Sequence, residues 1–212
     1  QVWRRVTALG DLEARLERPL LRRLHDAGVA TLVAGSTWPT DELRLASAFA
    51  RARTVSPFRL IIAPHEPTEE HLAGLERTLT GQGLEHARLA AVEETDGPLP
   101  EVVIVDRVGV LADLYGIGDI AYVGGGFHGA GLHSVVEPAA LGVPVLFGPR
   151  HGNAREAGEL AWHGGGSVVR DVGQLASLLE TLARDAEARA EAGRLALDFV
   201  RSRLGGAGRN AG

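Results

Sequence analysis

The stretch from Ile120 to Pro149, IAYVGGGFHGAGLHSVVEPAALGVPVLFGP, decides the fold of this chain. Its apolar residues 120–123 predict a buried strand that runs straight into the triple glycine at 124–126. A helix is predicted over residues 132–141, and a second buried strand over 143–147. The order strand, glycine loop, helix, strand is typical of one half of a nucleotide-binding parallel sheet.

The glycines of this loop predict an anion site. Residues without a Cβ let backbone N–H groups approach a phosphate, and a following helix directs its positive dipole end to the same place. The predicted helix puts His133 in its first turn and Glu137 four positions later on the same face. We therefore expect His133 and Glu137 to face a bound anion together. A tight turn without a ligand would explain any single glycine here, but it is a weak explanation for five glycines in eight residues.

Gly124, Gly126 and Gly129 also satisfy the dinucleotide pattern G-x-G-x-x-G. That pattern requires an acidic residue about 20 positions further on, to hold the cofactor ribose. The chain has Phe147, Gly148, Pro149 and Arg150 at that place, none of them acidic, and four strand-like runs precede the glycines. The sequence therefore disfavours NAD binding, and no cofactor is expected.

The composition describes an ordinary α/β protein: 212 residues, 45% hydrophobic and 23% charged, with a formal net charge of −5. The negative charge argues against a nucleic-acid partner. The absence of cysteine and lysine excludes thiolate catalysis, cysteine-ligated zinc, Schiff-base chemistry and a P-loop lysine. No apolar run reaches the ~20 residues that a membrane span needs, so we expect a soluble chain. Because the chain begins with Gln1, we expect it to be part of a longer protein.

Alternating strand-like and helix-like segments predict a Rossmann-like, doubly wound parallel sheet within one domain at 28–204. The Arg-rich residues 1–27 are expected to form a helical connector, and 205–212 a disordered tail. Strands are predicted at 30–34, 60–63, 88–92, 102–106, 120–123, 143–147 and 167–169. Helices are predicted at about 40–53, 69–81, 110–116, 132–141, 153–162, 172–184 and 186–204.

Ligands of such sheets bind at the carboxyl ends of the strands, so the residues that follow each strand are the candidate site. Asn153 has a simpler interpretation as the N-cap of the helix after it, and the threonines at 37 and 40 as caps of another. The histidines at 25, 71, 86 and 163 lie away from this edge, and we expect them to face solvent. No metal site is predicted, because the chain has no Asp-x-Asp motif.

Four motifs in order resemble one known family. They are GSTWPTDE at 35–42, LIIAPHEP at 60–67, YGIGDIAYVGGGFHGAGLHSVVEPAALGVPVLFGP at 115–149 and NAREAGEL at 153–160. Together they resemble the carboxyl-terminal half of 3-deoxy-D-manno-octulosonic acid (Kdo) transferases. The resemblance implies one half of a GT-B fold, in which this half binds the donor CMP-Kdo. It also implies that the acceptor, a lipid A precursor, and the catalytic base belong to an amino-terminal domain that this sequence does not contain.

The resemblance assigns roles to residues of the predicted edge. It implies that Ser36, Thr37 and the loop 125–127 line the donor phosphate, that His65 lies beside the sugar carboxylate, and that 107–109 face the cytosine. Glu137 would hold the ribose hydroxyls. The full donor-binding set expected is Ser36, Thr37, His65, Glu66, Arg107, Val108, Gly109, Gly125, Gly126, Phe127, His133, Ser134, Glu137 and Asn153.

Two positions depart from the family pattern: Pro64 stands where many relatives have arginine, and Ser134 where they usually have asparagine. The resemblance implies an inverting, metal-independent transfer in lipopolysaccharide biosynthesis, at the cytoplasmic face of the bacterial inner membrane. Two alternatives remain open from the sequence. One is an enzyme similar to nucleotide-sugar 2-epimerases, which share this fold, and the other is a non-catalytic nucleotide-binding module.

Overall fold

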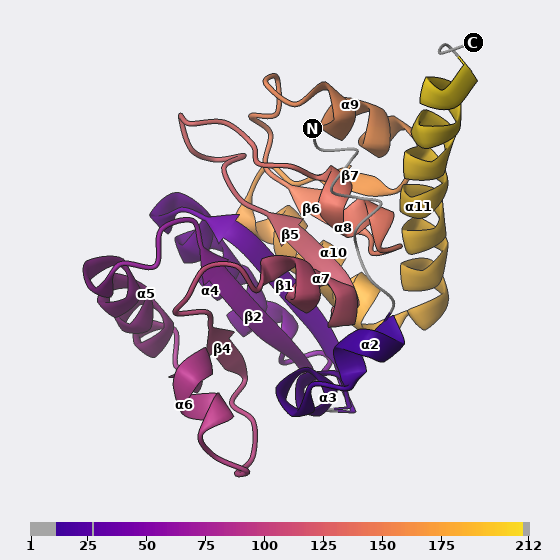
Figure 1. Cartoon of the computed structure of the whole chain (residues 1–212). Coiled ribbons are helices and arrows are strands. Elements are labelled where there is room, and N and C mark those ends of the chain that lie inside the picture. Colours follow the sequence, from indigo (N-terminus) through magenta and orange to yellow (C-terminus); the bar gives the residue numbers. More distant parts are fainter. Residues whose placement is uncertain (1–11, 27, 210–212) are drawn as a thin grey trace.

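The computed structural model describes residues 12–26 and 28–209 of the chain. Within that part, seven parallel strands form one sheet in the order β3-β4-β2-β1-β5-β6-β7 (Figure 1). The strands are β1 (Ala30–Thr37), β2 (Phe58–Pro64), β3 (His86–Arg88), β4 (Val102–Ile104), β5 (Ile120–Val123), β6 (Val145–Phe147) and β7 (Gly166–Val168). The parallel sheet that the sequence predicted is confirmed.

Helices cover both faces of the sheet (Figure 1). They are α2 (Leu12–Leu16), α3 (Pro19–His25), α4 (Pro39–Ala52), α5 (Glu69–Gly81), α6 (Leu89–Glu93), α7 (Leu111–Ile117), α8 (Val136–Ala140), α9 (Arg155–Trp162), α10 (Val172–Arg184) and α11 (Ala186–Arg209). Side chains of α4, α5 and α10 form one buried layer, and side chains of α3, α6, α7, α8, α9 and α11 form the other.

The strands read as continuous apolar runs because both of their faces are buried. In β1, Val33 packs into one layer, whereas Leu32 and Ala34 pack into the other. Successive side chains of a strand point to opposite faces, so a sheet covered on both sides needs an apolar residue at nearly every position. The doubly wound, Rossmann-like fold follows from this pattern and is confirmed.

The sheet has a topological switch point between β1 and β5. From β1 the chain continues to β2 on one side, while β5 pairs with β1 on the other side, with Gly35 opposite Val123. Open parallel sheets bind ligands in the crevice that such a reversal leaves at the carboxyl ends of the strands. Here the loops after β1 and β5 meet at that point, where the N–H of Gly124 donates to the carbonyl of Gly35 at 2.9 Å.

Several predicted boundaries differ from the structure by a few residues, and two predicted elements were partly of the wrong type. Residues 88–92, predicted as one strand, divide into β3, which ends at Arg88, and α6, which begins at Leu89. Arg88 is held by ion pairs to Glu69 and Glu76 on α5, which anchors the end of β3, and the following LAAVE contains good helix formers. The predicted helix 132–141 is correct only for its second half, because α8 begins at Val136.

The two ends of the chain differ in part from expectation. Within the predicted connector 1–27, α2 and α3 are helical, and Leu21 and Leu24 are buried in the same layer as α7. Residues 1–11 and 27 lie outside the described part. The last helix was predicted to end at Leu204 but continues to Arg209, so most of the tail expected to be disordered is helical. Phe199 and Val200 anchor α11 in the core, and extending an anchored helix costs little. Residues 210–212 lie outside the described part.

Candidate functional site

The glycine loop after β5 packs so closely on neighbouring backbone that side chains are excluded. Gly125 has a φ of +95°, and a Cβ on it would lie 2.1 Å from the carbonyl oxygen of Gly131. A Cβ on Gly126 would lie 2.5 Å from the backbone nitrogen of Gly148 in the loop after β6. These contacts show that the loop is a packed structure that joins the ends of two strands.

Asp41 holds this loop and was missed as a site residue. Its carboxylate is fully buried and accepts hydrogen bonds from the N–H of Gly125 at 2.9 Å, the N–H of Trp38 at 3.0 Å and the hydroxyl of Tyr122 at 2.9 Å. Asp41 lies in the first turn of α4, where an acid also favours the helix dipole. One N–H of the predicted phosphate cradle is therefore already used, and no protein acceptor in the described part bonds the N–H groups of Gly126 and Phe127.

The segment before α8 is extended, and this changes the expected role of His133. Asn153 accepts a hydrogen bond from the N–H of Leu132 at 3.0 Å and donates one to its carbonyl at 2.9 Å. Since both backbone groups of Leu132 are taken, the chain cannot be helical there, and His133 instead donates its N–H to Gly124 at 3.2 Å. The predictions that His133 lies in the first helical turn and shares a helix face with Glu137 were therefore wrong.

Asn153 is likewise not the N-cap of α9. The residue at that position is Ala154, which makes no side-chain capping bond. Both polar atoms of the Asn153 amide are occupied by Leu132. In the site, Asn153 fixes the backbone of Leu132, the residue that precedes His133.

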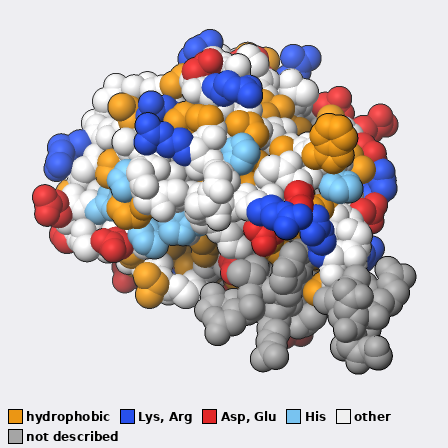
Figure 2. Space-filling view, turned by 90° about the horizontal axis from the view of Figure 1, so that it is seen from above, with side chains coloured by type: hydrophobic (Ala, Val, Ile, Leu, Met, Phe, Trp, Pro, Cys, Tyr) orange, Lys and Arg blue, Asp and Glu red, His pale blue; other side chains and the backbone are white. Residues whose placement is uncertain are grey.

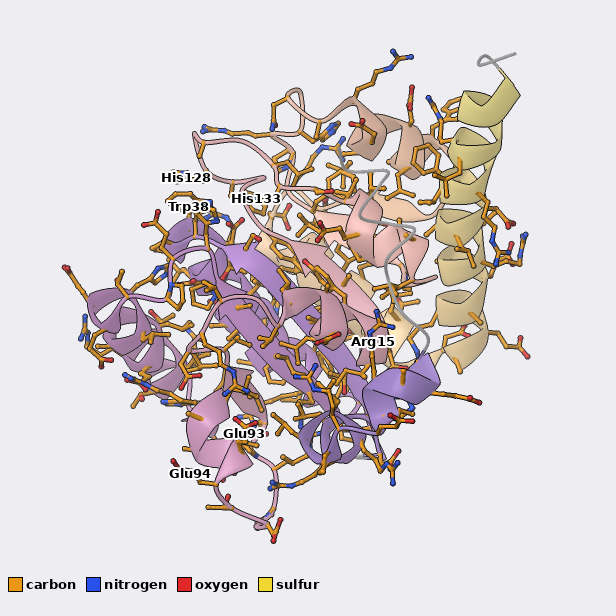
Figure 3. All side chains as sticks on the ribbon, in the orientation of Figure 1. Arg15, Trp38, Glu93, Glu94, His128 and His133 are labelled. Atoms are coloured by element: carbon orange, nitrogen blue, oxygen red, sulfur yellow. The ribbon has the colours of Figure 1, made fainter. Side chains whose placement is uncertain are left out.

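Four aromatic rings gather at the carboxyl edge of the sheet. Trp38 stacks on His128 with ring centroids 4.1 Å apart and an angle of 9° between the planes. Trp38 also contacts His65 at 4.9 Å, and His65 contacts His133 at 4.4 Å. Figure 3 shows Trp38, His128 and His133 close together at the upper edge of the sheet, and in Figure 2 histidine side chains mark the face seen from above. Trp38 and His128 were not predicted as site residues, because a lone ring in a loop carries no pattern in the sequence.

The four rings of Trp38, His65, His128 and His133 form an aromatic group, and the pKa of His133 within it is sensitive to nearby charge. Burial lowers the pKa of His133, and the neighbouring His65 lowers it further, whereas Asp41 opposes the change. An unliganded His133 is therefore held more in the neutral form than a free imidazole. A bound phosphate or carboxylate would favour its protonated form, because an opposite charge stabilises the imidazolium.

Ser36 and Thr37 differ in what they offer a ligand. Ser36 is half-buried in the left-handed conformation, with a φ of 53°, at an irregularity in the pairing of β1 with β2. The side chain of Thr37 is fully buried, and its hydroxyl donates to Glu42 at 2.9 Å. The threonine side chain therefore does not line the edge, contrary to prediction, because β1 extends to include it.

His71 was predicted to face solvent, and this was wrong. Its imidazole contacts the buried carboxylate of Glu42 at 2.9 Å and the backbone carbonyl of Glu66 at 3.0 Å. Burial raises the pKa of Glu42, and the interaction with His71 partly offsets this. The contact joins α4 to the loop that carries His65, so it stabilises the position of that loop at the carboxyl end of β2.

The remaining predicted residues lie at the ends of other strands. In the loop after β4, the guanidinium of Arg107 pairs with Glu93 at 2.6 Å, Val108 is 77% exposed and Gly109 has a φ of +89°. Glu66, after β2, is exposed. Phe127 is half-buried, with the guanidinium of Arg44 4.5 Å from its ring centre.

Glu137 lies in the first turn of α8, at the β1 side of the crevice. The pKa of Tyr115 is raised mainly by burial and further by the negative charge of Glu137. The Tyr115 hydroxyl in turn lies so close to Gly35 that a Cβ there would be 2.2 Å from it. Within the described residues Glu137 makes no ion pair, so its carboxylate is available to accept hydrogen bonds from a ligand.

The edge thus brings together N–H groups of the glycine loop, two imidazoles and a carboxylate, which suit a phosphate and a diol. Among residues 12–26 and 28–209, no group of three His, Asp or Glu side chains is arranged to hold a metal ion. In the same part of the chain, no helix is long and apolar enough to cross a membrane.

The fold is that of one half of a GT-B glycosyltransferase. The structure superimposes on the carboxyl-terminal CMP-Kdo-binding domain of WaaA from Acinetobacter baumannii with a TM-score of 0.74, at 19% identity, over 86% of this chain and 98% of that domain. It also superimposes on WaaG, a glycosyltransferase of lipopolysaccharide biosynthesis, with a TM-score of 0.60, at 16% identity, over 87% of this chain and 46% of that one.

In sequence, the chain is 31% identical to the 3-deoxy-D-manno-octulosonic acid transferase of Aquifex aeolicus over 153 residues. The match covers 71% of this chain and 41% of that protein, so the chain spans less than half of its relative. No protein-family model matches the chain. The chain is a relative of the Kdo transferases, with the fold of their carboxyl-terminal domain, as its motifs indicated.

Proposed function

We propose that this chain is the donor-binding domain of an enzyme that transfers Kdo from CMP-Kdo. The observation that carries the proposal is the convergence of unlike groups at the switch point between β1 and β5. The glycine loop contributes N–H groups, His65 and His133 contribute imidazoles, and Glu137 contributes a carboxylate. A CMP-activated sugar acid presents one phosphate, one carboxylate and a ribose diol, which these groups match in charge and hydrogen bonding.

Each part of the donor has a proposed contact. The phosphate lies against the N–H groups of Gly126 and Phe127 and the hydroxyl of Ser36. The sugar carboxylate lies beside His65 and His133, and the ribose hydroxyls donate to Glu137. The exposed loop 107–109 faces the cytosine, where Val108 offers an apolar surface to the base.

The reaction we propose is an inverting displacement that needs no metal. The leaving phosphate is stabilised by N–H groups and imidazoles, as oxyanions are in other enzymes. An inverting displacement also needs a base on the acceptor side, and we place this base, with the lipid A precursor, on an amino-terminal half of the enzyme. The matching Aquifex relative is long enough to contain such a half, since this match covers 41% of it. We propose that the whole enzyme acts at the cytoplasmic face of the bacterial inner membrane.

Calorimetric titration of the chain tests the donor assignment. CMP should bind, NAD should bind weakly or not at all, and UDP should bind more weakly than CMP. The variant His133→Gln should weaken CMP-Kdo binding, while His163→Gln, which changes an exposed histidine after α9, serves as the matched control. Tight NAD binding without a response to CMP would overturn the proposal. A preference for UDP would favour the epimerase alternative instead.

A further inference from the structure

A small pocket opens beside the glycine loop, and His133 is the one residue of its lining with a donor contact proposed so far. It encloses ≈ 130 Å³ between the extended segment before α8 and the first turn of α9. Its polar wall consists of His133, Ser134, Asn153 and Glu156, and its apolar wall includes Val135 and Val136. His133 belongs to both this pocket and the aromatic group, so the pocket adjoins the proposed position of the donor sugar.

Two buried polar atoms at this pocket have no partner within the described part of the protein. They are Nε2 of His133 and Oγ of Ser134. Buried polar groups are almost always hydrogen-bonded, because leaving one unpaired costs free energy. These two atoms belong to adjacent residues that line one pocket, so a group bound there would complete their hydrogen bonds once the side chains turn toward it.

Glu156 sets the charge of the pocket. It is half-buried, and among the described residues it makes no ion pair, whereas Glu159 on the same helix pairs with Arg155 and Arg203. Its place in the first turn of α9 favours the helix dipole, but this alone does not explain why it lines a pocket. A carboxylate here accepts hydrogen bonds and repels anions, so the pocket does not suit the phosphate or the sugar carboxylate.

The remaining chemistry is that of neutral hydroxyl groups. A hydroxyl can donate to Glu156 and accept from Ser134 or His133. The pocket is small, at ≈ 130 Å³, which suits a short arm that carries hydroxyls.

We propose that this pocket binds the exocyclic, hydroxylated arm of the donor sugar, with Ser134 and Glu156 as specificity-determining residues. This inference rests on the proposed function, since it assumes that a nucleotide sugar occupies the crevice. Asn153 contributes by holding Leu132 in place through both polar atoms of its amide, and it makes no contact with the sugar.

The test compares CMP with freshly prepared CMP-Kdo in calorimetric titrations of the whole chain. Glu156→Gln and Ser134→Ala should each leave CMP binding unchanged. Glu156→Gln should weaken CMP-Kdo binding by about tenfold to a hundredfold and Ser134→Ala by about twofold to tenfold, the effects of one lost hydrogen bond to a charged and to a neutral group. Glu159→Gln removes a charge from the same helix outside the pocket and should change neither affinity. Thermal unfolding of each variant confirms that it is folded.

The outcomes separate the inference from the proposed function. If the wild-type chain binds neither ligand, the donor-binding function fails and the inference fails with it. If CMP binds but CMP-Kdo binds no more tightly, or if both pocket variants keep the wild-type preference for CMP-Kdo, the function survives and the pocket assignment is wrong.

Discussion

Glu137 is the residue on which recognition of the nucleotide depends most directly in our proposal. It lies in the first turn of α8, half-buried and without an ion pair in the described part of the chain. A surface glutamate on a short helix would be an alternative interpretation. The buried neighbours Val136, Pro138 and Ala139 argue against it, because they place α8 inside the domain.

Glu137→Ala should weaken CMP binding by roughly one to two orders of magnitude, since a hydrogen bond to a charged group contributes ~1.5–3 kcal/mol. The ligand gives the sharper test. The wild type should prefer CMP to its 2′,3′-dideoxy analogue, while Glu137→Ala should bind both about equally in calorimetric titration. A mutant that keeps the wild-type preference would show that another residue contacts the ribose.

His133 should make donor binding depend on pH. Its pKa is lowered in the unliganded protein, and an adjacent anion would raise it, so binding should be coupled to the uptake of a proton. The affinity for CMP-Kdo should therefore increase as the pH falls from 8 towards 6. Titrations in buffers of different ionisation enthalpy measure this uptake. His133→Gln should reduce it, and uptake unchanged in that variant would contradict the assignment.

The same shift has a consequence for stability. Between the lowered pKa of folded His133 and the value of about 6.5 in the unfolded chain, the unfolded state binds more protons. His133 therefore lowers the stability of the unliganded protein as the pH falls through that window. Binding of an anionic ligand would raise the pKa of His133 and so oppose this loss of stability.

At the scale of elements, Asp41 joins three parts of the fold: the start of α4, strand β5 and the glycine loop. It accepts hydrogen bonds from Trp38, Tyr122 and Gly125, all from a position with no exposed surface. The hydroxyl of Tyr122 has its pKa raised well above the usual value by burial and by this carboxylate. The conformation of the glycine loop therefore depends on Asp41, which lies in the connection between β1 and β2.

Asp41→Ala should destabilise the chain by about 3 kcal/mol or more, because each buried donor left without an acceptor costs ~1–3 kcal/mol. Urea unfolding measures the change. Thr40→Ala, at the exposed neighbouring position, is the control and should have little effect, and Tyr122→Phe should cost less than Asp41→Ala because it removes only one of the three bonds. Equal stability of Asp41→Ala and Thr40→Ala would show that the carboxylate is not needed.

At the scale of the whole molecule, the proposed function divides between this chain and a second half. In this proposal, the edge described here stabilises the leaving phosphate. Glu66 is the exposed carboxylate of the candidate set that follows β2 and is the first alternative for a base. The chain spans less than half of its Aquifex relative, which leaves room for an acceptor domain in that protein.

The chain alone should therefore bind CMP-Kdo without transferring the sugar to a lipid A precursor. Radiolabelled transfer assays should show turnover only when an amino-terminal half, taken from a related transferase, is added. Substantial turnover by the chain alone, abolished by Glu66→Gln, would contradict this division and place the base within the chain.

The sequence by itself determined the layered architecture, since period and composition act locally. Continuous apolar runs specified strands buried on both faces, and β5 and the helices α5 and α10 were predicted with their observed bounds. The ordered motifs also indicated the family, because their residue types and spacing are specific. The strands in turn determined which loops meet at the crevice, since parallel strands end at the same edge.

Only the tertiary structure decided the details of the site, because its partners are far apart in the chain. Asp41 and Gly125 are 84 residues apart, and no local pattern connects them. Asn153 reaches 21 residues back to Leu132, takes both of its backbone groups and so delays the start of α8 until Val136. The stacking of Trp38 on His128 and the burial of Thr37 depend equally on neighbours brought close by folding. Hydrogen bonds and packing between distant segments outweigh local helix preference at these positions, and a sequence read locally does not contain them.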